Sequence, residues 1–158
     1  MESKELVNSE PTMTETNSPI DFTKGVPRLL RWLLGIIGVG LMLAIVPVFI
    51  PINWMAISHE WLGLGEFPEQ SITLYLARST SLLYAVHGTL MLIVAVQIRQ
   101  YWGLVRVFGW LHVGIGAVMF GIDLHSAMPW YWTAVEGIPI AMAGLLIVWL
   151  VNVCERTS

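Results

Sequence analysis

Apolar residues along this chain gather into four long stretches separated by short polar segments. The stretches run over about residues 29–50, 72–98, 104–124 and 133–153. Each reaches the length of about 20 residues that a helix needs to cross the hydrocarbon core of a bilayer. Lipid offers the backbone no hydrogen-bonding partner, so such stretches must be helical. The pattern therefore predicts an all-α fold, an integral membrane four-helix bundle over residues 27–154.

The segment between the first and second stretches has a helical pattern of its own. Trp54, Ile57 and Trp61 recur at helical spacing, and Asn53 is suited to be the N-cap. Polar residues occupy the other faces. This arrangement predicts a short amphipathic helix over about residues 53–63 that lies in the membrane interface, outside the bundle.

The first 22 residues are polar, rich in Ser, Thr, Glu and Asn, and have no apolar periodicity. Such a composition predicts a disordered tail over residues 1–26. The first apolar stretch is too long to be the apolar region of a cleavable signal peptide. We therefore expect that stretch to act as its own uncleaved targeting signal.

Composition supports the membrane assignment and narrows the partners. The chain of 158 residues is 56% hydrophobic and 12% charged, about half of the roughly 25% charged residues usual in soluble domains. The net charge is −3 and no basic stripe is present, which argues against a nucleic-acid partner. The expected partner is the lipid bilayer, with a homo-oligomer or a larger membrane complex left open. The single cysteine, Cys154, rules out a disulfide framework.

Basic residues predict the orientation of the chain in the membrane. Seven of the eight Lys and Arg residues lie before or at the start of the first stretch, between the second stretch and the start of the third, or after the fourth: Lys4, Lys24, Arg28, Arg31, Arg99, Arg106 and Arg156. The two other connections contain none. By the positive-inside rule, the N- and C-termini and the middle connection are cytoplasmic. The tryptophans fall near both predicted interfaces, as indole rings prefer.

Apart from the basic residues that set the orientation, six ionisable side chains lie within or at the ends of the apolar stretches. They are Arg78, His87, His112, Asp123, His125 and Glu136. A charge at membrane depth costs about 2.5–3.5 kcal/mol on insertion scales, so it persists only with a partner or a function. These residues are therefore the candidates for a site.

Four of them, Arg78, Asp123, His125 and Glu136, are expected at similar depth near the outer ends of three helices. A buried Arg is best satisfied by a carboxylate, so we expect Arg78 to hydrogen-bond to Asp123, with Glu136 close by. Local explanations exist as well. Glu136 can form a capping box with Thr133, Arg78 can extend to the headgroups, and His125 can lie in the interface. The cluster is therefore either structural or an outward-facing pocket.

The other two ionisable residues, His87 and His112, fall near the middle of the second and third stretches and can face each other. Such histidines usually hydrogen-bond across helices as neutral packing elements, and a proton-relay or ligand role is the alternative. The chain contains no HExxH, no Cys/His metal framework, no phosphate-binding loop and no nucleophile elbow. We therefore predict no cofactor, no metal and no catalytic residue.

The runs YLARSTSLLYAVHG and GIDLHSAMPWYWTAVEG resemble small four-helix bacterial membrane proteins of the DoxX-like kind. The resemblance covers about residues 54–150. It implies a four-helix bundle in the bacterial cytoplasmic (inner) membrane, and it transfers no functional residue. The N-terminal tail is not part of the pattern.

Three functions compete at this point. The leading hypothesis is a small non-enzymatic membrane protein with a structural or accessory role. The alternative is a membrane enzyme or a protein that binds a lipid-like ligand in an outward-facing pocket of Arg, Asp, His and Glu side chains. A further alternative is proton-coupled transport by an oligomer, because four spans are few for a lone transporter. A cavity beside the polar residues would favour ligand binding, and tight packing would favour the structural role.

Overall fold

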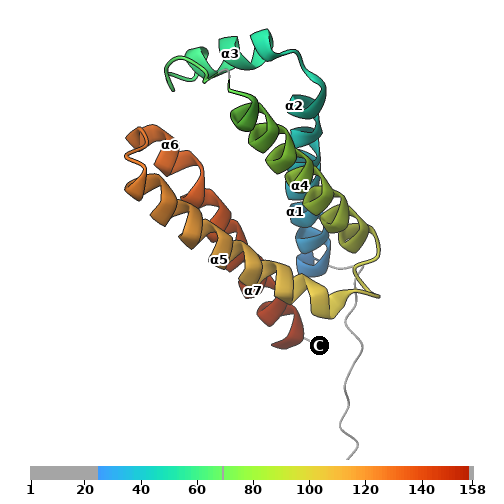
Figure 1. Cartoon of the computed structure of the whole chain (residues 1–158). Helices are drawn as coiled ribbons and strands as arrows, with labels where there is room; N and C mark the ends of the chain where they lie inside the picture. The colour runs from blue at the N-terminus through green and yellow to red at the C-terminus, as the bar shows by residue number, and fades with distance from the viewer. Residues whose placement is uncertain (1–24, 69, 157–158) are drawn as a thin grey trace, which may run out of the picture.

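The computed structural model describes residues 25–68 and 70–156, and within these residues every regular element is a helix (Figure 1). The elements are α1 (Gly25–Met42), the short 3₁₀ helix η1 (Leu43–Ile45), α2 (Val46–Phe49), α3 (Ile52–Trp61), α4 (Ser71–Val96), α5 (Trp102–His125), α6 (Trp130–Val135) and α7 (Gly137–Arg156). The predicted all-α class is confirmed. The predicted tail lies outside the described residues, apart from Gly25 and Val26, which already belong to α1.

Four segments are long and apolar enough to cross a membrane. They are Gly25–Phe49, Ser71–Val96, Trp102–His125 and Trp130–Arg156. They match the four predicted stretches with shifts of a few residues at the ends. Large apolar side chains are exposed along all four segments, which suits contact with lipid and not with water.

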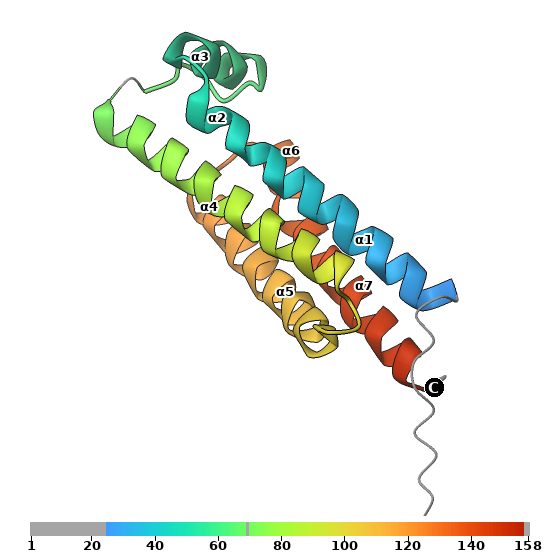
Figure 2. The ribbon, with the colours of Figure 1, turned by 90° about the vertical axis from the view of Figure 1, so that its right-hand side faces the viewer.

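The long helices form two antiparallel pairs, α1 with α4 and α5 with α7 (Figures 1 and 2). Glycines let the backbones of each pair touch. A Cβ atom on Gly116 would lie 2.6 Å from the carbonyl oxygen of Gly137, and one on Gly88 would lie 2.6 Å from that of Gly38. Small residues of this kind are what membrane helices use to approach closely.

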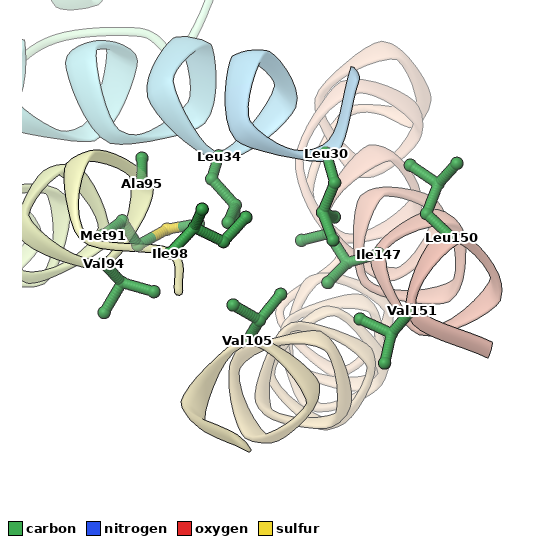
Figure 3. Packing of buried hydrophobic residues seen from close by; sticks show 10 residues of the cluster. All are labelled: Leu30, Leu34, Met91, Val94, Ala95, Ile98, Val105, Ile147, Leu150 and Val151. Carbon is green, nitrogen blue, oxygen red and sulfur yellow. The ribbon is translucent and has the colours of Figure 1, made fainter. Parts of the chain in front are cut away.

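The two pairs meet at one end of the molecule, which we call the basal end. It holds the start of α1 and the end of α7, and from there the pairs diverge toward α3 and α6 at the distal end (Figure 1). A cluster of buried apolar side chains joins the pairs at the basal end (Figure 3). Its members are Leu30, Leu34, Met91, Val94, Ala95, Ile98, Val105, Ile147, Leu150 and Val151.

Polar side chains also tie α5 to α7 at the basal end. Arg106 forms an ion pair with Glu155 and donates a hydrogen bond to the side-chain oxygen of Asn152 (3.3 Å). The Nε1–H of Trp102 donates to Glu155 as well (3.2 Å). These bonds reinforce the pair just outside its apolar contact.

Two prolines interrupt the membrane-length segments toward the distal end. A proline inside a helix lacks its N–H, and its ring clashes with the carbonyl four residues earlier. Pro47 lies four residues after the start of η1, where the first segment tightens to a 3₁₀ turn. Pro139 lies four residues after Val135, the last residue of α6, and the helix breaks at Glu136 (φ −99°, ψ −80°). The fourth predicted stretch, over about residues 133–153, is therefore a helical segment divided between α6 and α7.

Helix α3 confirms that the first connection is helical, at Ile52–Trp61 instead of about residues 53–63. Pro51 and not Asn53 precedes it, and no side chain caps it. Trp54, Ile57 and Trp61 are exposed, Trp61 to 84%. The protein thus presents indole rings at the distal end without covering them.

Candidate functional site

The two buried histidines lie side by side between the helix pairs. The rings of His87 (α4) and His112 (α5) have centroids 5.2 Å apart, tilted by 41°. The ring of Phe108 meets His87 edge-on at 5.5 Å. The Nδ1–H of His112 donates to the carbonyl oxygen of Phe108 (2.8 Å), so the Nε2 of a neutral His112 is left as an acceptor.

His87 is incompletely satisfied. Its Nε2 atom is buried and has no hydrogen-bond partner among the described residues. Leaving a buried polar atom unpaired costs about 1–3 kcal/mol. The structure thus brings together the two histidines that were expected at similar depth, and one of them keeps an unused polar atom.

A cavity of about 300 Å³ lies beside the two histidines. All four long helices contribute to its wall, which is almost wholly apolar: Ile37, Leu41, Tyr84, His87, His112, Ile115, Pro139, Ile140 and Ala143. Its volume is at the lower end of the range of about 300–1,000 Å³ for small-molecule sites. Such a space fits a small apolar group better than a charged one, because a charge would find few polar partners there.

Arg78 does not bind Asp123, contrary to the sequence-based expectation. Its Nη2 donates to the carbonyl oxygen of Ile50, the C-cap residue directly after α2 (3.3 Å). Within residues 25–68 and 70–156, it forms no ion pair with Asp123 or Glu136. The last carbonyls of a helix lack partners within the helix and attract cations. Arg78 therefore fastens α2 to α4, inside one helix pair.

Asp123 is the most deeply buried of the acidic candidates, at 3% exposure. It follows Gly109 and Gly116 at seven-residue steps, and these glycines face α7. A Cβ atom on Gly137 would contact the backbone of Phe120, which lies about one helical turn before Asp123. One carboxylate oxygen, Oδ2, is buried without a hydrogen-bond partner in the described part of the chain. The carboxylate is left without the arginine expected beside it.

Glu136 occupies the break between α6 and α7. The indole Nε1–H of Trp132 donates to its Oε2 atom, so the predicted capping box with Thr133 is wrong. Thr133 lies inside α6, because the helix begins at Trp130. Glu136 interacts electrostatically with Asp123 and with Tyr84. Tyr84 is one of the residues that line the cavity.

His125, the fourth member of the predicted cluster, is exposed at the end of α5. The structure therefore divides the six candidates into four local settings: Arg78 of α4 beside the end of α2, the Asp123–Glu136 region, the His87–His112 pair, and His125 by itself. None of Arg78, Asp123, His125 and Glu136 lines the cavity. Among the described residues, no three His, Cys, Asp or Glu side chains converge as a metal site.

Three contributors to this region had no role in the sequence-based cluster: Trp132, Phe108 and Pro139. Trp132 was assigned only to the interface, although a residue four positions before Glu136 lies on the same helical face. Phe108 contributes its carbonyl oxygen, which no sequence pattern marks. Pro139 could have been used to predict the break in the helix. A proline has no N–H to donate to the carbonyl four residues earlier, so that carbonyl is left unpaired.

Comparison with known proteins returns no match, since no family model, no curated protein and no solved structure matches this chain. The fold is an all-helical one with four helices of membrane-spanning length and apolarity. The resemblance to DoxX-like proteins stays a prediction. The observations that bear on function are therefore the cavity and the polar residues described above.

Proposed function

We propose that the chain is a multi-pass integral membrane protein with four spans and with both termini in the cytoplasm. The support is the agreement of charge with architecture. Arg28 and Arg31 are in the first turns of α1, Arg99 lies in the α4–α5 turn, Arg106 is in the first turns of α5, and Arg156 ends α7. All of these positions belong to the basal end, where basic residues would face the cytoplasm. A bacterial inner membrane follows from the DoxX-like resemblance alone.

In this orientation the distal end faces outward, and α3 lies in the outer interface. Its exposed Trp54, Ile57 and Trp61 support that placement, because indole rings favour the headgroup level. The helix would anchor the distal ends of α2 and α4.

The orientation predicts a labelling pattern. In a Cys154→Ser background, single cysteines at Glu66 and Met128 should react with a membrane-impermeant thiol reagent added to intact cells. A cysteine at Gln100, in the α4–α5 turn, should react only after the cells are opened. Labelling of Gln100 alone in intact cells would reverse the orientation and contradict the proposal.

We further propose that the protein binds a small apolar or amphiphilic molecule from the bilayer in the cavity beside His87 and His112. The observation that carries this proposal is the cavity itself, built by all four long helices with two imidazoles and a phenol in its wall. Tight packing throughout would have favoured a purely structural protein. The proposed role is non-enzymatic binding, and the outer polar residues support the fold, as Arg78 does at the end of α2.

Filling the cavity tests this proposal. We expect Ala143→Phe to lower, by about tenfold or more, the amount of small molecule that copurifies with the full-length protein. Tenfold corresponds to about 1.4 kcal/mol of binding free energy. Organic extraction and mass spectrometry measure the retained molecule. Met142→Phe is the matched control, since Met142 is 64% exposed and does not line the cavity.

Two results would contradict ligand binding in the cavity. One is that no small molecule is retained by the wild-type protein. The other is that Ala143→Phe and Met142→Phe retain it equally. In either case the structural hypothesis would stand as the better account of the bundle.

A further inference from the structure

A basic hollow lies between the start of α1 and the end of α4. Its volume is about 530 Å³, and three arginines line it: Arg28 and Arg31 from α1 and Arg99 from the turn after α4. All three side chains are exposed. Three guanidinium groups around one hollow favour a ligand with a negative charge, because arginine binds phosphate oxygens in a bidentate manner.

An apolar hollow of about 630 Å³ adjoins the basic one and shares Arg28, Arg31 and Val96 with it. Trp32 and Gly35 of α1 and Leu92 and Ala95 of α4 form the rest of its wall. Gly35 creates room, since an added Cβ atom there would meet nothing within 4 Å. This second hollow leads from the arginines along the α1–α4 pair, away from the basal end.

We infer that these two adjoining hollows form a binding site for one anionic phospholipid, with its phosphate among the three arginines and an acyl chain along the apolar hollow. Charge complementarity supports the headgroup, and the apolar continuation distinguishes a lipid from a free phosphate. Basic pockets between helices on the cytoplasmic side of a membrane are suited to anionic headgroups. The inference rests on the proposed membrane orientation, and it is separate from the cavity beside the histidines.

The charge half of the site can be tested with defined lipids. The full-length protein in detergent is titrated with dioleoylphosphatidylglycerol or dioleoylphosphatidylcholine, and bound lipid is counted by native mass spectrometry. We expect a clear preference for the anionic lipid. Arg31→Gln should weaken its binding about fivefold, the factor expected for one basic residue near an anionic surface. Arg156→Gln removes the same charge at the same end outside the hollow and should have little effect.

The apolar half of the site has its own matched pair of variants. Gly35→Leu places a side chain in the apolar hollow and should weaken binding of phosphatidylglycerol without changing the charge. Gly40→Leu, on the same helix, is the control, because an added Cβ atom there also meets nothing within 4 Å and Gly40 lines neither hollow. Both variants should fold, since each position has open space.

Three outcomes would overturn the inference. They are equal binding of the two lipids, equal effects of the site variants and their controls, and binding of soluble glycerol phosphate as tight as that of the lipid. Failure of the membrane proposal is distinguishable, because cysteine labelling reports it independently. A protein that labels as a four-span membrane protein but shows no anionic preference contradicts only the lipid site.

Discussion

We expect Gly116→Ala to lower the free energy of unfolding by roughly 1–3 kcal/mol, the usual range for an overpacked contact. The added methyl group would lie 2.5 Å from the backbone nitrogen of Ala141 and 2.6 Å from the carbonyl oxygen of Gly137. Both are backbone atoms, so the clash can be relieved only by moving α7 away from α5. Unfolding of the purified protein in mixed micelles with increasing denaturing detergent measures the change.

Gly114→Ala is the matched control, two residues away on the same helix. A methyl group at Gly114 would meet nothing within 4 Å, and alanine is favoured over glycine in a helix by about 0.8–1.0 kcal/mol. We therefore expect Gly114→Ala to be neutral or stabilising. If the two variants destabilise the protein equally, the close approach of α5 and α7 at Gly116 is wrong.

The second large effect is expected at Arg78. Arg78→Gln should lower the free energy of unfolding by about 1.5–3 kcal/mol, the range for a hydrogen bond that involves a charged group. The reason is that the carbonyl oxygen of Ile50 loses its donor and α2 loses its bond to α4. Asp123→Asn should have little effect on stability, because it removes a carboxylate that has no ion-pair partner in the described part of the chain.

A double-mutant cycle of Arg78→Gln and Asp123→Asn separates this account from the ion pair that the sequence suggested. Without direct contact, the two changes should add to within about 0.5 kcal/mol. A coupling energy well above 1 kcal/mol would mean that the two side chains bind each other. The same detergent-unfolding measurement serves all three variants.

The sequence predicted the four long helices well, because the signal for each is spread over some twenty apolar residues. Errors at the ends of such a run leave its identity intact. It also predicted a helix near residues 53–63 from the spacing of Trp54, Ile57 and Trp61. It did not predict the break at Glu136, three residues before Pro139. The ring removes a hydrogen bond to the carbonyl of Val135, and the chain breaks at the next residue.

Of the six candidate residues, only His87 and His112 line the cavity. His87 and His112 were placed at similar depth, and they do lie together. Arg78 and Asp123 were also placed at similar depth, but depth along a helix does not say which neighbouring helix a side chain faces. Arg78 instead donates to the carbonyl oxygen of Ile50, directly after α2 in its own helix pair. Sequence does not show which backbone carbonyl oxygen will accept such a hydrogen bond, because every residue has one.

The sequence by itself therefore determined the helical class, the approximate ends of the four long segments and the clustering of basic residues. These features depend on composition and on periodicity within single helices. The tertiary structure alone decided that the helices form two pairs, that the pairs meet at the basal end, and that a cavity remains beside the histidines. Those features depend on which glycines meet across a helix pair, and apolar helices of similar length offer many such pairings of nearly equal burial.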